Sequence, residues 1–160
     1  MRILHTNDLH GMLNQEVEER LLVLRQQADI YLDSGDSGAF GNLAVPLKQD
    51  PVWERFARLS LTAQVPGNRE YHVMESVFSR KIGGATHPIV AANLFRTSGE
   101  LVLPPSLIIT VGDQRVGIVG VMLQATRRGE NAIPGVNLYQ TDPVEAALSE
   151  GKRLRPEVDT

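Results

Sequence analysis

Apolar and polar positions along the first part of the chain predict strands and helices in alternation. Ile3 and Leu4 stand before a polar run and predict a buried strand over residues 2–7. Apolar residues then recur at helical spacing in a charged background, which predicts an amphipathic helix over 15–28. A second short strand is predicted over 29–32. The residues that would form the inner face of the helix are Val17, Leu21, Leu24 and Ala28.

Helix-start signals and a further apolar run continue the alternation. Asp50 as a cap and Pro51 as the first residue predict a helix through about Leu59. A short strand is predicted over 61–65 and another helix over 70–82. The residues predicted to face inward are Trp53, Phe56 and Ala57 in the first of these helices and Val73, Val77 and Phe78 in the second.

The second half of the chain predicts one apolar strand, one hairpin and one helix. PIVAAN, residues 88–93, is continuously apolar, as in a strand with both faces covered. SLIITVGDQRVGIVGV predicts a hairpin with Gly112-Asp113 at its turn, and residues 124–140 are expected to be irregular. The signals that begin the last helix, which runs to about Leu154, are Asp142 as the cap, Pro143, and Glu145 in the capping-box position.

This order of elements predicts an α/β fold, and 160 residues correspond to a single domain, 1–160. A net charge of −3, a pI near 5.8 and the absence of a Lys/Arg cluster argue against a nucleic-acid or membrane-surface partner. The first strand begins at once, without a cleavable leader, and no apolar run reaches membrane-spanning length. We therefore expect a cytoplasmic protein.

Oxygen and imidazole side chains follow the first three predicted strands. Asp8 and His10 come after the first strand, Asp36 after the second and Asn68 after the third. Because the carboxyl ends of parallel strands meet at one edge of a sheet, these side chains are expected to lie together. The sequence has no cysteine, so a metal would be held by oxygen and imidazole ligands, as in a two-metal hydrolytic site. Ordinary turns are the alternative, because Asp, Asn and Gly are common turn residues.

Five short blocks match those of a known family in the same order. ILHTNDLHG, residues 3–11, matches the block hydrophobic-His-Thr-Asn-Asp-x-His-Gly; DSGD, 33–36, matches Asp-Ala/Ser-Gly-Asp; GNRE, 67–70, matches Gly-Asn-His-Glu. A strand ending in Ala92-Asn93 and a strand with Val116-Gly117-Ile118 follow. The chain thereby resembles the calcineurin-like metallophosphoesterases, in their 5′-nucleotidase and UDP-sugar hydrolase branch. The resemblance implies the N-terminal half of a metallophosphatase-type layered α/β/β/α sandwich.

The resemblance also implies a hydrolase that cleaves phosphate esters or anhydrides by attack of a metal-bridging hydroxide. Asp8 and His10 would hold one metal, Asp36 would bridge both metals, and Asn68 would hold the second. Asn68 and Arg69 would contact the phosphoryl group of a small phosphorylated substrate such as a nucleotide. The implied cofactor is a divalent metal, Mn, Mg, Zn or Fe, at two sites, of which the second is expected to bind weakly.

One departure from the family lies in the third block, where Arg69 replaces a histidine. A guanidinium stays charged and cannot act as a general acid, although it can stabilise charge on a phosphoryl group. Substrates with good leaving groups should therefore be hydrolysed best. His72, three residues after Arg69 and thus one helical turn away if the helix starts at Glu70, is a candidate substitute. Outside the ligand set, Asp33 is expected to shape the strand end and His5 to have a structural role.

A second departure is that the family's remaining histidine ligands would follow the last helix predicted here. We therefore expect a domain truncated before its second half and a low metal affinity. The chain is then an enzyme, a catalytically impaired relative that acts as a weak metal-binding, phosphate-binding or interaction module, or a fragment of a longer enzyme. An uncovered sheet would expose more than the few hundred Å² of apolar surface usual for monomers, which predicts a two-fold homodimer.

Overall fold

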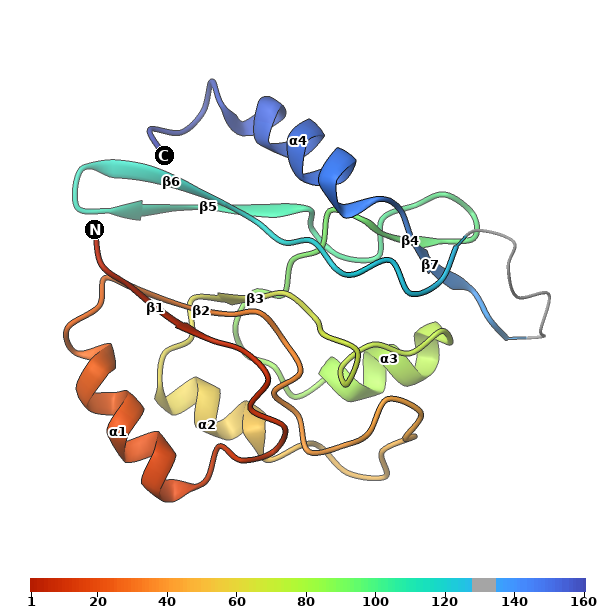
Figure 1. The fold of residues 1–160 in the computed structure, drawn as a ribbon, viewed down its shortest axis with the longest axis horizontal. Coiled ribbons are helices and arrows are strands. Elements are labelled where there is room, and N and C mark those ends of the chain that lie inside the picture. The colour runs from red at the N-terminus through yellow and green to blue at the C-terminus, as the bar shows by residue number, and fades with distance from the viewer. Residues whose placement is uncertain (128–134) are drawn as a thin grey trace. The chain divides into compact units, whose positions relative to one another are not determined.

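A computed structural model describes residues 1–127 and 135–160 and divides the chain into two compact units (Figure 1). The N-terminal unit comprises residues 1–72 and 76–88, and the C-terminal unit comprises residues 73–75 and 89–160. Among the described residues, no helix combines the length and the apolar character needed to cross a membrane.

Three parallel strands form the sheet of the N-terminal unit, in the order β1-β2-β3. They are β1 (Ile3–Thr6), β2 (Ile30–Asp33) and β3 (Ala63–Gln64), and all three lie within or one residue from the predicted strands. Thr6 pairs with Asp33, and Asp33 pairs with Gln64, so the three strands end side by side. The loops that follow them therefore start from one edge of the sheet.

Three helices belong to this part of the chain: α1 (Gln15–Arg25), α2 (Val52–Arg58) and α3 (Glu75–Ile82). Figure 1 shows α1 and α2 on the same side of the sheet. Their apolar residues form a core with the sheet in which Tyr31, Phe56 and Leu59 are fully buried. Asp50 Oδ1 accepts a hydrogen bond from Val52 N at 3.0 Å, but α2 begins at Val52 with Pro51 as its N-cap, one residue later than predicted.

The expectation that the first strand is buried is wrong. Ile3 is 52% exposed, and His5, two residues on, is exposed on the same face. Leu4 lies on the opposite face and packs against the core. The first strand is therefore half-buried, because α1 and α2 cover only one face of the sheet.

Three details of the predicted helices are wrong as well. Leu24 and Ala57, expected to face inward, are exposed, and Glu18 occupies an inner position of α1 instead. The third helix begins at Glu75 rather than at residue 70, because residues 68–70 form a turn in which Tyr71 N donates to Gly67 O at 2.9 Å.

The C-terminal unit contains two antiparallel strand pairs and one helix. Strand β4 (Leu94–Arg96) pairs with β7 (Leu138–Gln140), and β5 (Ser106–Val111) pairs with β6 (Gln114–Val119). The predicted hairpin with Gly112-Asp113 at its turn is confirmed. Helix α4 (Pro143–Leu154) also follows the prediction, because the Asp142 carboxylate accepts the N–H groups of Val144 and Glu145 at 2.8 and 2.9 Å.

Two expectations for this unit are wrong. Residues 88–93 form no strand, although Val90, Ala91 and Ala92 are buried as expected. Ala91 N donates to Pro104 O and Ala92 N to Gly120 O, so neighbouring residues bond to different segments and no ladder forms. Residues 138–140, expected to be irregular, form β7. Part of that predicted irregular segment, 128–134, lies outside the described residues.

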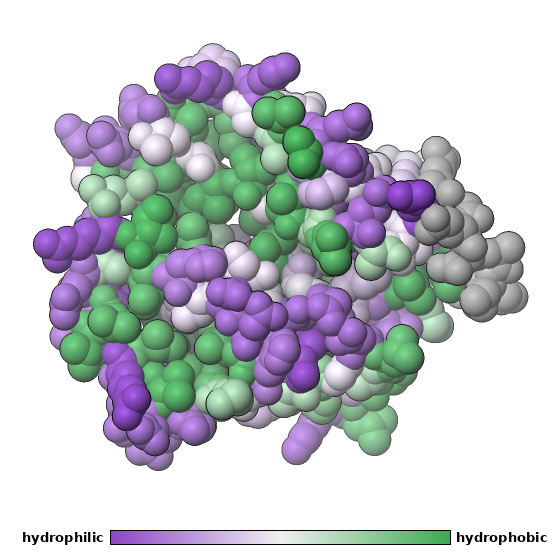
Figure 2. Space-filling model, viewed as in Figure 1, coloured by the Kyte–Doolittle hydropathy of each residue, from purple (hydrophilic) through white to green (hydrophobic). Residues whose placement is uncertain are grey.

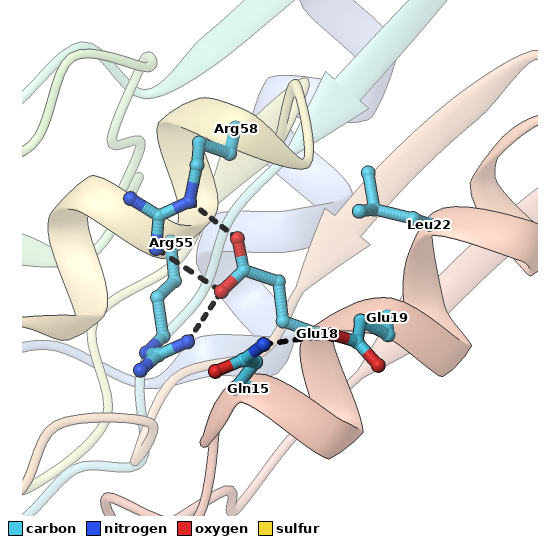
Figure 3. Close-up of a pocket in the computed structure, with 6 residues that line it drawn as sticks. All are labelled: Gln15, Glu18, Glu19, Leu22, Arg55 and Arg58. Carbon is cyan, nitrogen blue, oxygen red and sulfur yellow. Dashed lines mark hydrogen bonds and ion pairs between the residues drawn. The ribbon is translucent and has the colours of Figure 1, made fainter.

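A buried carboxylate joins α1 to α2 (Figure 3). Glu18 is only 6% exposed and accepts hydrogen bonds from Arg55 and Arg58, including one of 3.0 Å from Arg58 Nη2. The hydrogen bonds from Arg58 are the largest cause that holds the pKa of Glu18 below its usual value. Two guanidinium groups around one carboxylate explain how a charged residue can hold an inner position.

Figure 2 shows apolar and polar side chains interspersed over the visible face.

We predict that Glu18→Gln lowers the free energy of unfolding by about 1–2 kcal/mol at pH 7, a value reduced for the solvent exposure of Arg58. Because the pKa of Glu18 is lowered by folding, its contribution is complete above the unfolded value of about 4.3 and is lost as the pH falls through the folded value. Urea unfolding at a series of pH values should therefore show wild type and variant converging in acid. Glu16→Gln, in the exposed pair with Arg20, should have no such effect. A Glu18→Gln difference that persists unchanged at a pH of about 3, below the unfolded value, would contradict the ionic contribution.

Candidate metal centre

Backbone hydrogen bonds join the loop after β1 to the loop after β2. Asp8 N donates to Gly35 O at 3.0 Å, His10 N to Asp36 O at 2.9 Å, and Gly11 N to Ser37 O at 2.9 Å. The two loops therefore run together beyond the end of the sheet. This pairing fixes the positions from which the side chains of residues 8, 10 and 36 extend.

Three of the proposed ligands have left-handed backbone conformations. The φ angles of Asp8, His10 and Asp36 are +53°, +49° and +56°, and Ser60 is the remaining non-glycine residue with positive φ in the part of the chain that the structure describes. Asp and His occupy this region more readily than most residues, yet each instance costs on the order of 1–3 kcal/mol. Strained residues of this kind concentrate at functional sites.

The side chains of these three residues converge. One possible ligand atom from each of Asp8, His10 and Asp36 lies within 4.8 Å of the others, and His10 Nε2 is 3.4 Å from Asp8 Oδ1. Two carboxylates and an imidazole form a donor set that suits Mn²⁺, Fe²⁺ or Zn²⁺. Asp8 and His10 are exposed and Asp36 is half-buried, so a cation can reach them. The residues present therefore fit a divalent metal ion.

A buried glutamate holds the loops after β2 and β3 together. Glu70 is 3% exposed, and its carboxylate accepts four backbone N–H groups. The donors are Asp36 at 2.8 Å, Ser37 at 3.1 Å, Gly38 at 2.9 Å and Gly67 at 3.0 Å. Burial raises the pKa of Glu70, and the hydrogen bonds from these N–H groups act in the opposite direction. Sequence reasoning gave Glu70 no such role, because three of its partners lie more than thirty positions away.

Two glycines permit this close approach. A Cβ at Gly35, where φ is +86°, would lie 2.1 Å from Gly67 N, and a Cβ at Gly67 would lie 2.4 Å from Asp36 N. No side chain fits at either position without moving backbone. The glycines of the DSGD and GNRE blocks thus let the two loops touch.

Asp33 organises the end of β2 from the inside. Its buried carboxylate accepts hydrogen bonds from the side chains of Thr6, Ser37 and Gln64 and from Gly35 N, at 2.7–3.0 Å. Burial raises the pKa of Asp33, and these bonds partly offset the effect. Both carboxylate oxygens are engaged in structure, in keeping with the expectation that Asp33 shapes the strand end.

Asn68 and Arg69 both contact Asp36. One end of the Asn68 side-chain amide lies against the Asp36 carboxylate, 3.0 Å from Oδ1. Arg69 N donates to Asp36 Oδ1 at 2.7 Å, whereas its guanidinium Nη1 donates to the carbonyl oxygens of Gly38 and Ala39 at 3.2 and 3.4 Å. The structure thus brings all four proposed ligands together and binds the Arg69 side chain to the loop that follows Asp36.

The other histidines have different settings. His5 is exposed, with Nε2 2.8 Å from Ser34 Oγ. His72 precedes α3 rather than lying within it, so the one-turn spacing that made it a substitute for Arg69 is wrong. His87 packs against Trp53 and Phe56, and burial lowers its pKa to about 4.

A lysine also escaped sequence reasoning. Lys81 is 4% exposed, and its Nζ donates to the carbonyl oxygens of Gly41, Asn42 and Arg69 at 3.0, 2.9 and 2.7 Å. Burial lowers the pKa of Lys81. Its ammonium therefore attaches the loop around residue 41 to the turn that carries Asn68 and Arg69.

We predict that Glu70→Gln lowers the free energy of unfolding by about 2–4 kcal/mol. Each carboxylate oxygen accepts two backbone N–H groups, and the NH₂ group that replaces one of these oxygens cannot accept a hydrogen bond, so two buried N–H groups would lose their acceptor. Urea unfolding followed by Trp53 fluorescence measures the loss. Glu54→Gln, at an exposed position of α2, is the matched control and should leave stability unchanged. Equal stability of Glu70→Gln and wild type would show that the four hydrogen bonds do not hold the loops.

Curated 5′-nucleotidases are similar to the chain in sequence, although no protein-family model matches it. It is 29% identical to the 5′-nucleotidase of Bos taurus over an alignment 187 positions long, which covers 99% of the chain and 31% of that protein. The 5′-nucleotidase of Homo sapiens gives the same identity and coverage. The chain thus spans less than a third of the length of these curated relatives.

Solved structures share the fold. The crystal structure of the 5′-nucleotidase precursor from Thermus thermophilus superposes with a TM-score of 0.73 at 24% identity, over 98% of the chain and 35% of that structure. The calcineurin-like phosphoesterase YfkN from Bacillus subtilis superposes with a TM-score of 0.76 at 22% identity, over 98% of the chain and 58% of that structure. The expected α/β fold of metallophosphatase type is confirmed. In sequence and in fold, the chain resembles the N-terminal half of the 5′-nucleotidase-type domain of calcineurin-like phosphoesterases, as its motifs indicated.

Proposed function

We propose that the chain carries a metal-dependent phosphoesterase site of the 5′-nucleotidase type. The observation that supports this most directly is the convergence of Asp8, His10 and Asp36, in left-handed conformations, at the end of a parallel sheet. Such strain is retained where the surrounding structure fixes it, here through the bonds of Glu70 and the pairing of the two loops. When bound, a divalent metal would lower the pKa of water and offset charge on the phosphoryl group.

The proposed roles of the residues are those that the family resemblance implies, and the positions of the side chains are compatible with them. Asp8 and His10 would hold the first metal, and Asp36, which contacts Asn68, would be shared with the second. Asn68 provides the remaining ligand from the loop after β3. We propose two sites with the second weaker, because Asn68 is a neutral amide and a poorer ligand for a divalent ion than a carboxylate.

Arg69 places its positive charge on the loop that follows Asp36. Its backbone N–H already bonds to Asp36, and its guanidinium lies over the carbonyl oxygens of Gly38 and Ala39. A guanidinium can stabilise charge on a phosphoryl group but cannot donate a proton to a leaving oxygen. We therefore propose activated phosphate esters or anhydrides as the substrates hydrolysed best.

The relatives are called 5′-nucleotidases, which makes nucleotide 5′-phosphates the first natural substrates to test. The second candidate function is a metal- or phosphate-binding module without turnover, which the replacement of a histidine by Arg69 favours. The homodimer and the cytoplasmic location stay predictions.

We predict that the chain hydrolyses an activated aryl phosphate with added Mn²⁺ and that Asp36→Asn lowers the rate by at least about 100-fold, because it removes the charge that both metals share. Initial rates at saturating Mn²⁺, with isothermal titration of Mn²⁺, provide the measurement. Asp113→Asn, in the exposed hairpin turn, makes the same chemical change away from the cluster and should keep wild-type values.

The outcomes separate the two candidate functions. Turnover that is lost only in Asp36→Asn supports the phosphoesterase. Mn²⁺ binding that is lost in Asp36→Asn, with no turnover in wild type, favours the binding module. Turnover or Mn²⁺ binding that is equal in Asp36→Asn and Asp113→Asn would contradict a metal site at Asp36.

A further inference from the structure

The outer end of the Asn68 amide contacts a second amide, that of Asn42. With its NH₂ toward Asp36, Asn68 donates to both carboxylate oxygens, and its own oxygen lies 2.7 Å from Asn42 Nδ2. The same outer atom lies 2.9 Å from Asn42 Oδ1. Asn42 therefore has a donor and an acceptor within hydrogen-bond distance of one atom of Asn68.

The two orientations of Asn68 differ in what they require from Asn42. With the NH₂ on Asp36, the outer atom is an oxygen and needs the Asn42 donor. With the amide oxygen turned toward a metal ion beside Asp36, the outer group is NH₂ and needs the Asn42 acceptor. An aliphatic, carboxylate or ammonium side chain at position 42 would satisfy one orientation at most.

The backbone of Asn42 is held by Lys81. Lys81 Nζ donates to the Asn42 carbonyl oxygen at 2.9 Å and to the neighbouring Gly41 carbonyl at 3.0 Å. The same ammonium donates to Arg69 O at 2.7 Å, one residue after Asn68. The buried Lys81 ammonium thus joins the backbone of Asn42, whose side chain is exposed, to the turn that contains Asn68.

We infer that Asn42 is a positioning residue that holds the Asn68 amide in two orientations, with its NH₂ on Asp36 in the metal-free protein and with its oxygen toward the ion in the metal-bound protein. The inference rests on the proposed role of Asn68 as a ligand. Metal binding then reverses the Asn68 amide, and its outer group exchanges the Asn42 Nδ2 donor for the Asn42 Oδ1 acceptor, which lies within the same reach. Lys81 acts one step further out and holds Asn42 through its backbone.

The first test observes the Asn68 side-chain NH₂ resonances by NMR, with Zn²⁺ as a diamagnetic probe. In wild type, Zn²⁺ should shift these resonances as their partner changes from Asp36 to Asn42. In metal-free Asn42→Asp they should differ from those of metal-free wild type, because carboxylates at positions 36 and 42 then both compete for the one NH₂ group of Asn68. Asn68 resonances that are the same in metal-free wild type, Asn42→Asp and Asn42→Ala would overturn the inference, whether or not zinc binds.

The second test compares Zn²⁺ dissociation constants. Asn42→Ala should weaken binding by about 10-fold or more, as the loss of partners around a ligand does, whereas Asn42→Asp should bind at least as tightly as wild type. If Asn42 had only a structural role, Asn42→Asp would not bind Zn²⁺ more tightly than Asn42→Ala. Leu43→Asp in the Asn42→Ala background adds the same charge at the neighbouring exposed position and should not restore binding. Asn42→Ala with wild-type affinity, or Asn42→Asp as weak as Asn42→Ala, would overturn the inference.

The two proposals fail in different ways. If Zn²⁺ shifts no resonances of His10 and Asp36 in wild type, the proposed metal site fails and the metal-bound half of the inference fails with it. If those resonances shift while Asn68 responds to none of the substitutions at residue 42, the metal site stands and the role of Asn42 is wrong.

Discussion

Four backbone N–H groups converge on the Glu70 carboxylate, and the arrangement of the candidate metal centre depends on that contact. The donors come from the loop after β2 and from the loop after β3, so one side chain joins two strand ends. Glu70 is buried, and these four N–H groups stabilise its carboxylate. A buried carboxylate with this many donors resists displacement, because any movement leaves N–H groups unpaired. Asp36 is the residue whose position is fixed by it most directly.

The strained backbone of the candidate ligands is held in place by the contacts of Glu70 and of the two loops. Left-handed conformations at Asp8, His10 and Asp36 cost free energy, which the bonds between the loops and the Glu70 contact offset. Gly35 and Gly67 allow the backbones to approach where a Cβ would collide. The result is an exposed cluster of two carboxylates and an imidazole whose geometry is set by buried groups beneath it. A site of this kind is organised before a cation arrives, which lowers the cost of binding one.

Sequence reasoning could bring the candidate ligands together because their positions depend on local signals. Asp8, His10, Asp36 and Asn68 each follow a short strand, and parallel strands bring such residues to one edge. Glu70, Lys81 and Asn42 could not be identified in this way, because their roles depend on hydrogen bonds to segments that are distant along the chain. The same limit explains the misplaced start of α3, where Glu70 belongs to a turn, and the strand expected at 88–93, where burial was predicted correctly but pairing was not. Glu18 looks like a solvated position in the sequence because its partners, Arg55 and Arg58, lie on another helix.

Anomalous X-ray diffraction from crystals of the chain grown with Zn²⁺ would examine the metal centre directly. The geometry predicts a zinc peak with His10 Nε2 or Nδ1 and oxygens of Asp8 and Asp36 at about 2.0–2.2 Å. The peak should be present while the backbone of the two loops and the Glu70 contacts stay as they are, because the site is already assembled. Zinc bound only elsewhere, or bound here after the loops have rearranged and the Glu70 bonds have broken, would contradict a preorganised metal centre at the end of the sheet.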